Sequence, residues 1–384
     1  ELFTPDNSYQ WPAWEILKTT IDQTPVPITE NVKISLIEDG SLRKTVCIEK
    51  HYGKSVFKQY IRLYEGDKAD QIDFNNIVDW KTQNALLKVA FPLNVTNMMA
   101  TYDLGLGRVK RGNNKTNAYE VYARQWADLT DKDGSYGVSI LNNCKYGWDK
   151  PDDNTLRLTL LHTPGVNTSY PYQAEQDLGH HVFTYSLIGH AGELNATSLS
   201  KRSEVLNQPI LPFISVTHNG QFGRTYSFAN SDNDNVRIKT FKKAEISDEF
   251  VLRVYEMGGK SVQNATITFS DDIADACEAD GTEKRTGPAV YTGKQLHVTI
   301  DPFHIKTYKL TFVKKVSKES EKQDFIPLQY NLKCFSYKAF RSEANFDSGY
   351  SYAAELLPDS ILTTSDQISF RLGPKDTNNG MSCN

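Results

Sequence analysis

The sequence has no long hydrophobic run and little excess of either charge. No apolar stretch among its 384 residues approaches the about 20 residues that a membrane-spanning helix needs, which excludes a helical membrane span. The 43 basic and 47 acidic residues are interspersed and leave a net charge of −4. This balance argues against nucleic acid as a partner, because a nucleic-acid-binding surface is broadly basic.

Paired cysteines and common catalytic motifs are also missing. The five cysteines are widely spaced and form no C-x-x-C pair, which predicts free thiols instead of a disulfide framework or a zinc ribbon. There is no G-x-S-x-G, H-E-x-x-H or G-x-G-x-x-G motif and no phosphate-binding loop. His180 and His181 are adjacent, so on a strand they face opposite ways. The sequence therefore predicts no metal site and no catalytic motif in this chain.

Alternation of apolar and polar residues dominates what is present. Leu87, Val89, Phe91, Leu93 and Val95 share one face, and similar period-2 patterns occur in residues 72–80, 156–160, 250–254, 296–300, 308–312 and 368–372. Turn dipeptides separate such segments, at Asp39-Gly40, Glu65-Gly66, Asp133-Gly134, Gly258-Gly259 and Asp280-Gly281. Helical periodicity is scarce, and the best candidates are Pro12–Thr19 and Tyr337–Ala344. The pattern predicts an all-β chain of antiparallel strands packed as sandwiches.

Composition suggests three regions. A large β-domain is expected over residues 1–235, ending in the polar stretch Ala229–Asn235, which is a candidate linker. A small sandwich is expected over residues 236–313. Residues 314–384 begin with the charged stretch KKVSKESEKQ and are expected to be a linker with a partial β-module. We interpret the chain as a piece of a longer protein.

Six ordered segments carry a resemblance to a known family. They are VDWKTQNALLKVAFPLNVTNMMATYD (78–103), WADLTDKDGSYGVSILNNCKYG (126–147), LRLTLLHTP (156–164), AEQDLGHHVFTYSLIGH (174–190), LRVYE (252–256) and PFHIKTYKL (302–310). Their order and spacing resemble the C-terminal region of glycoside hydrolase family 38 α-mannosidases, in the bacterial and cytosolic branch. The tail, with NFDSGYSYAAELLP and LGPKDTNN, resembles the segment after that region in some bacterial members.

The resemblance implies a large two-sheet β-supersandwich, similar to galactose mutarotase, followed by a small immunoglobulin-like sandwich. It also implies that the catalytic machinery lies elsewhere. The family consists of retaining exo-mannosidases, whose N-terminal barrel holds zinc through two Asp and two His, one Asp also being the nucleophile. This chain contains no His-x-Asp and no His-Asp dipeptide. We therefore expect no catalytic residue and no cofactor here, and no activity of this chain alone.

The resemblance places a hairpin of the supersandwich at the rim of the active site. Residues 142–150 (NNCKYGWDK) hold that position, and we expect Lys145, Tyr146 and Asp149 to contact substrate or brace the barrel. Tyr102 and Asp103 end a strand and are candidates for the interface with the barrel. Arg108, Lys110 and Arg111 are expected at a solvated hairpin tip, and Trp126 is expected in the core.

The implied partners are the N-terminal catalytic domain of the same polypeptide, mannose-containing glycans and a further copy of the protein. Exported bacterial relatives favour the periplasm or secretion, with the cytoplasm as the alternative. A free-standing carbohydrate-binding protein is the second hypothesis. A mutarotase-like epimerase is the third, with His181 and Glu175 as its only loose base–acid pair.

Overall fold

The computed structural model describes residues 1–313 except 7, 9, 167–169, 213–219 and 221–224, and beyond residue 313 only short strands. The chain divides into two compact units. The first comprises Glu1–Val166 and Ala174–Lys315, and the second comprises Asn167–Gln173 and Val316–Asn384. The described residues are mostly β-structure, so the predicted all-β class is confirmed. Four of the five turn dipeptides lie between consecutive strands, and the fifth, Asp39-Gly40, begins at the last residue of β2.

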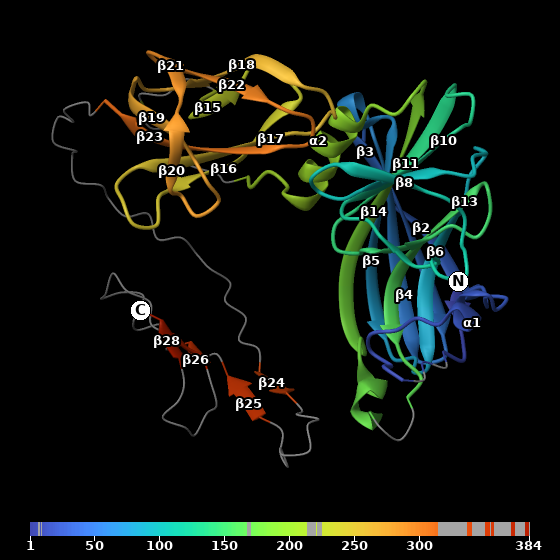
Figure 1. Ribbon diagram of the computed structural model, residues 1–384. Coiled ribbons are helices and arrows are strands. Elements are labelled where there is room, and N and C mark those ends of the chain that lie inside the picture. Colours follow the sequence, from blue (N-terminus) through green and yellow to red (C-terminus); the bar gives the residue numbers. More distant parts are fainter. Residues whose placement is uncertain are drawn as a thin grey trace. The chain divides into compact units, whose positions relative to one another are not determined.

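The first sheet of the large sandwich has nine antiparallel strands in the order β2-β3-β4-β5-β14-β11-β10-β7-β8. Hydrogen bonding between neighbours in sequence builds most of it, which suits the short turns between them. Figure 1 shows β4, β5 and β14 as long strands of this sheet. Its strands are β2 (Glu30–Asp39), β3 (Arg43–Tyr52), β4 (Ser55–Tyr64), β5 (Gln71–Trp80), β7 (Ala100–Asp103), β8 (Arg108–Arg111), β10 (Trp126–Thr130), β11 (Tyr136–Asn142) and β14 (Gly179–Ala191).

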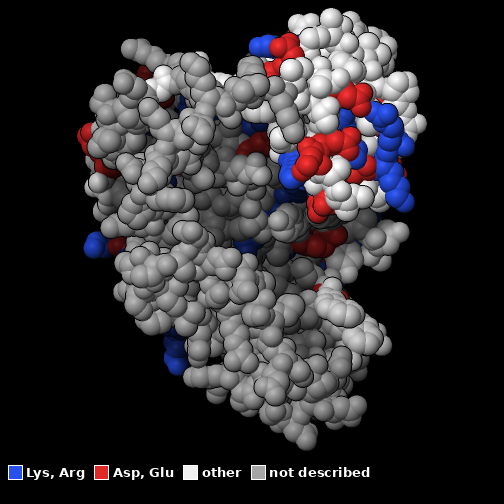
Figure 2. All heavy atoms as spheres, turned by 90° about the vertical axis from the view of Figure 1, so that its left-hand side faces the viewer, with Lys and Arg blue, Asp and Glu red and all other residues white. Residues whose placement is uncertain are grey.

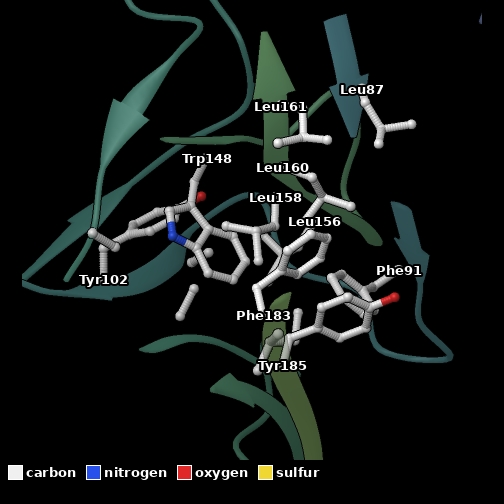
Figure 3. Close-up of a cluster of buried hydrophobic side chains, with 14 of the residues drawn as sticks. Leu87, Phe91, Tyr102, Trp148, Leu156, Leu158, Leu160, Leu161, Phe183 and Tyr185 are labelled. Atoms are coloured by element: carbon white, nitrogen blue, oxygen red, sulfur yellow. The ribbon is translucent and has the colours of Figure 1, made fainter. Parts of the chain in front are cut away.

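The second sheet of the large sandwich has five strands in the order β1-β6-β13-β12-β9. They are β1 (Leu2–Phe3), β6 (Ala85–Pro92), β9 (Val121–Tyr122), β12 (Gly147–Asp149) and β13 (Thr155–Thr163). The apolar faces of both sheets meet in one buried cluster. In Figure 3, Leu156, Leu158 and Leu160 of β13 lie opposite Phe183 and Tyr185 of β14. Burial of these faces is the main stabilising contribution to the large sandwich.

Helices are few and short among the described residues. α1 (Lys18–Ile21) has four residues and overlaps the predicted helix Pro12–Thr19 only at its end, since residues 12–14 form a turn. α2 (Ala196–Asn207) was not predicted. It packs Ala196 and Leu199 against Trp126, which is buried as expected. Two 3₁₀ turns, η1 (Gly66–Lys68) and η2 (Pro171–Glu175), complete the helical structure.

The small sandwich consists of two further antiparallel sheets. One has four strands in the order β15-β18-β22-β21, and the other has five in the order β16-β17-β23-β19-β20. Their strands are β15 (Ala229–Ser231), β16 (Val236–Lys243), β17 (Phe250–Glu256), β18 (Val262–Phe269), β19 (Ile273–Ala279), β20 (Arg285–Pro288), β21 (Val290–Thr292), β22 (Gln295–Ile300) and β23 (Ile305–Phe312). β15 pairs with β18, so the first part of the predicted linker Ala229–Asn235 is an edge strand of this sandwich.

Acidic and basic side chains lie close together on the described part of the face drawn in Figure 2. Exposed ion pairs also occur on the small sandwich, such as Arg285 with Asp275, at 2.7 Å. Such exposed pairs contribute little to stability.

In the second unit, the described strands are β24 (Ser336–Ala339), β25 (Tyr350–Ala353), β26 (Glu355–Leu356), β27 (Phe370–Leu372) and β28 (Met381–Cys383). β24 pairs with β25, and β26, β27 and β28 form a three-stranded sheet. The helix predicted over Tyr337–Ala344 is wrong for residues 337–339, which belong to β24. Residues 340–344 lie outside the described residues. The aromatic residues Phe335, Tyr337 and Phe340 in this sequence favour a strand over a helix.

Candidate functional site

The rim segment predicted from the sequence, residues 142–150, does not form a hairpin. β11 belongs to the nine-stranded sheet and β12 to the five-stranded sheet, so residues 143–146 cross from one sheet to the other. Asn143 fixes this connection on β14: its side-chain oxygen accepts from the Thr184 amide at 3.0 Å, and its own amide donates to the Thr184 carbonyl. Asn142 adds a hydrogen bond from the Lys145 amide, at 2.8 Å. The predicted residues therefore stand on a short, well-anchored loop.

Tyr146 is the most exposed of the predicted site residues, with 52% of its surface accessible. Its ring stacks on that of Tyr122, which is also exposed, with centroids 6.1 Å apart and planes inclined by 19°. The Tyr146 carbonyl accepts from the Ala123 amide, which ties the loop to the residue after β9. Together the two rings form an exposed aromatic surface, which we call the tyrosine pair.

Lys145 turns back onto the sandwich. Its Nζ lies 4.9 Å from the ring centroid of Phe183, a residue of the core. Burial lowers the pKa of Lys145 below its ordinary value, since the charged form loses water there. A cation over an aromatic ring recovers part of that lost hydration energy. In this arrangement Lys145 holds the loop against β14.

Asp149 has no exposed side-chain surface in the described structure. Its carboxylate lies 2.9 Å from Lys88 Nζ and 2.5 Å from Arg157 Nη2, and it accepts a hydrogen bond from Asn114. Burial alone would raise its pKa, but Lys88 and Arg157 outweigh burial and hold the pKa below its ordinary value. The sequence placed Asp149 among the substrate contacts. With all its partners inside the domain, it instead has the geometry of a structural ion-pair centre.

Tyr102 and Asp103, the predicted interface residues, are both buried. Asp103 accepts hydrogen bonds from the amides of Gly105 and Gln125, and so fixes the turn between β7 and β8. Burial raises the pKa of Asp103 above its ordinary value. The Tyr102 ring lies in the core, and the Arg111 guanidinium lies over it at 5.5 Å. Asp103 therefore holds the β7–β8 turn, whereas Tyr102 packs in the core of the large sandwich.

The β7–β8 turn contacts the small sandwich. Arg108 donates to the Gly258 carbonyl at 3.3 Å and lies over the ring of Phe303, so it is not the solvated tip that the sequence suggested. Glu204 of α2 joins the same boundary, because it accepts from Arg237 at 2.7 Å and from the Tyr255 hydroxyl at 3.0 Å. Charged side chains thus link the two sandwiches within the first unit.

Sequence reasoning missed the buried charges behind the rim loop. Lys88, on β6, has no exposed side-chain surface and contacts Glu120, Thr159 and Asp149. The only signal was a lysine inside the apolar run LLKVAF. Alternation placed Lys88 opposite the core face but gave no sign that the face is covered. On this side of β6, Glu120 contacts Lys88 itself. Beside it, Phe3 and Ile21 of the N-terminal segment and Tyr119 pack against Leu86.

Over the part of the chain that the structure describes, no group of three or more His, Cys, Asp or Glu side chains is arranged to hold a metal ion. The carboxylates of the rim and of its surroundings are already engaged by cations and amides. Within the same residues, no helix is long and apolar enough to cross a membrane.

A large two-sheet sandwich followed by a small sandwich defines the class of this chain as an all-β protein built of two β-sandwich domains. Comparison with known sequences identifies the family. Residues 2–168 match the glycosyl hydrolases family 38 C-terminal domain, and residues 235–308 match the family 38 C-terminal beta sandwich domain. The chain therefore belongs to glycoside hydrolase family 38 and corresponds to its C-terminal domains, which confirms the resemblance. Residues 321–384 match an AziU2-like beta-sandwich domain.

Curated relatives agree with this assignment. The chain is 29% identical to alpha-mannosidase G of Dictyostelium discoideum over 325 residues, which cover 79% of this chain and 28% of that protein. It is 27% identical to alpha-mannosidase 2C1 of Mus musculus over 311 residues, covering 78% of this chain and 29% of that protein. The chain thus spans less than a third of the length of these relatives.

Among solved structures, an alpha-mannosidase from Enterococcus faecalis V583 has a similar fold. Its TM-score with this chain is 0.62 at 15% sequence identity, over 73% of this chain and 35% of that one. A family 38 protein from Enterococcus faecalis gives a TM-score of 0.61 at 16% identity, with 73% and 37% covered. At these identities the likeness supports the fold only.

Proposed function

We propose that this chain is the C-terminal, non-catalytic half of a retaining exo-α-mannosidase that hydrolyses terminal α-mannosides of glycans. The observation that carries the proposal is the match to two family 38 C-terminal domains in the order large sandwich, then small sandwich. The curated relatives are alpha-mannosidases, and most of their length lies outside the region that this chain matches. The nucleophile, the general acid and the zinc ligands then belong to an N-terminal catalytic domain.

The rim loop is the part of this chain that we assign to the active-site wall. Tyr146 presents an exposed ring, and stacking on Tyr122 fixes its orientation. A flat aromatic surface packs well against the apolar face of a sugar ring. Lys145 and Asp149 act behind it: Lys145 rests on Phe183, and Asp149 ties β12 to β13 and β6. Of the three predicted contacts, Tyr146 is therefore the one that we place against substrate.

Support of the catalytic domain is the second role that we propose. Tyr102 and Asp103 contribute indirectly: Asp103 holds the β7–β8 turn through its hydrogen bonds, and Tyr102 packs in the core of the large sandwich. The division that we propose keeps the large sandwich over residues 1–235, the small sandwich over 236–313 and a linker with a β-module over 314–384. β15 extends the small sandwich back into the end of the first region. We also expect self-association of the intact protein, which sedimentation velocity measures.

The rim assignment is tested in the full-length protein with Tyr146→Ala. Loss of one stacking surface is expected to lower kcat/KM for a mannoside by about tenfold, with the melting temperature unchanged. Tyr136→Ala is the matched control, because Tyr136 is similarly exposed, at 43%, and lies at the opposite end of β11. Equal kcat/KM for both variants and wild type would remove Tyr146 from the active-site wall.

A free-standing carbohydrate-binding protein is the second candidate, and the exposed tyrosine pair is the feature that favours it. Titration calorimetry of this chain with mannose oligosaccharides separates the two. Binding by the 384-residue chain that disappears in Tyr146→Ala would favour the binding module. Absence of binding, together with activity of the longer protein, is the outcome that we expect.

A further inference from the structure

The inner face of the nine-stranded sheet continues beyond the five-stranded sheet that covers it. Two cross-strand rows show this. One row runs from Phe183 through Asn76, Gln59 and Ile48 to Ile34, and the other from Tyr185 through Phe74, Ile61 and Val46 to Leu36. Phe183 and Tyr185 are buried in the core, whereas Ile34 and Leu36, on β2, are 66% and 60% exposed.

Residues directly paired across a sheet share one face. Ile34 and Leu36 therefore face the same side as the buried core, and they are exposed because nothing among the described residues covers them. A long edge strand with exposed apolar residues is a feature that folded proteins avoid or cover. The five-stranded sheet is thus too narrow for the sheet on which it packs.

A cleft of about 370 Å³ lies where the covering sheet stops. Its walls combine Phe57 and Asn76 of the large sheet with Leu87 and Val89 of β6, and Glu1 also lines it. β1 is the last strand of the five-stranded sheet, with β6 as its neighbour. The N-terminus lies beside β6 in Figure 1.

β6 offers an unfilled pairing position next to Glu1. The Lys88 amide donates to the Glu1 carbonyl at 3.0 Å, and the Glu1 amino group donates to the Lys88 carbonyl at 3.0 Å. In an antiparallel pair, main-chain groups two residues apart point to the same side. The Ala90 amide and carbonyl therefore point to the β1 side, where no described residue pairs with them. The register Leu2 with Leu87 places the second residue before Glu1 opposite Ala90.

We propose that the residues immediately preceding Glu1 in the intact protein continue β1 along β6 and supply further strands that cover the inner face of β2 to β4. The covering strands carry apolar residues at alternate positions, facing Ile34 and Leu36. The large sandwich then begins before residue 1, and its second sheet is wider than five strands. The proposal rests on the longer protein inferred above, but it concerns this domain's own core and not the catalytic domain.

Hydrogen–deuterium exchange with mass spectrometry tests the pairing without mutation. The peptides to follow are those of β6 and β2 in the 384-residue chain and in the full-length protein, with β17 of the small sandwich as the internal control. Exchange of the Ala90 amide is expected to slow by about 100-fold or more in the full-length protein, while β17 is unchanged. Equal exchange of β6 in both proteins would overturn the proposal.

A pair of substitutions tests the covering of β2. Ile34→Asp is expected to lower the unfolding midpoint of the full-length protein but to leave that of the 384-residue chain unchanged. Leu42→Asp is the matched control, because Leu42 is 77% exposed and follows β2 in the turn to β3. Leu42→Asp is expected to leave the unfolding midpoint of both proteins unchanged. A neutral Ile34→Asp in the full-length protein would contradict the proposal.

Other occupants give different outcomes. If the catalytic domain covers β2 instead, Ile34→Asp destabilises the full-length protein but β6 gains no protection. If a second copy covers it, protection of β2 depends on protein concentration. Either result would overturn the proposal, and neither depends on whether the longer protein hydrolyses mannosides.

Discussion

Lys88 and Asp149 form an ion pair inside the large sandwich, with Nζ 2.9 Å from the carboxylate and no exposed surface on either side chain. Lys88 lies on β6 and Asp149 on β12, and β13 runs between these two strands. Glu120 and Arg157 complete the cluster. Because each charge has an opposite partner, the cluster holds β6, β13 and β12 together next to the loop of residues 143–146.

Loss of Lys88 is predicted to be costly. Lys88→Met removes a cation from the fully buried Asp149 and the ion-pair partner of the partly buried Glu120, which is expected to lower the free energy of unfolding by about 3–5 kcal/mol. Lys44→Met is the control, since Lys44 and Asp39 form an exposed pair, and its cost is expected to be about 0–1 kcal/mol. Urea denaturation of the 384-residue chain measures both. Equal, small effects would mean that the buried cluster does not stabilise the sandwich.

His190 is predicted to make stability depend on pH. Its Nε2 lies 2.9 Å from the Asp128 carboxylate, and this hydrogen bond raises the pKa of His190 above its ordinary value. The extra stability is therefore fully present below the unfolded-state pKa of about 6.5 and is lost as the pH rises through the higher folded-state pKa. His190→Gln is expected to cost more stability at pH 5.5 than at pH 9.

Thermal unfolding of wild type and His190→Gln across this range tests the sign. His180→Gln is the comparison, because His180 is exposed on the same strand, β14. If the difference in melting temperature between wild type and His190→Gln grew with rising pH, the assigned ion pair would be contradicted.

The packing of α2 gives a third prediction. Leu199 is buried against Trp126 and β11, so Leu199→Ala is expected to lower the free energy of unfolding by about 2–5 kcal/mol. Val205 lies on the same helix and is 47% exposed. Val205→Ala therefore serves as the control and is expected to change stability by about 0.5 kcal/mol or less. Similar losses for the two variants would show that α2 does not pack as described.

Strands and turns were predictable from the sequence because alternation reports directly on a half-buried sheet. Phe250–Glu256 shows this: the apolar alternation predicts a strand there, and β17 has those bounds. Alternation fails where both faces of a sheet are covered. The alternation over residues 72–80 predicts that Asp73 faces solvent. In the structure Asp73 is buried and accepts hydrogen bonds from Gln71, Tyr64 and Ser186.

α2 escaped prediction because its buried side is small. Only Ala196, Leu199 and Ser203 are buried, and the remaining surface is polar, so the helical period is weak. The Asn195 side chain, which accepts from the Ser198 amide, was the available signal for its start. The tyrosine pair was equally hidden: Tyr122 and Tyr146 lie 24 positions apart, and only the packing of β9 beside β12 brings them together.

The central claim is that this region supports catalysis without performing it. Hydrolysis of 4-nitrophenyl α-mannoside, with added zinc, by the 384-residue chain and by the full-length protein side by side tests it most directly. The account predicts that only the full-length protein releases 4-nitrophenol above the uncatalysed rate. If the 384-residue chain alone, purified to homogeneity, released 4-nitrophenol above the uncatalysed rate, the account would be contradicted. The catalytic carboxylates would then lie within these residues.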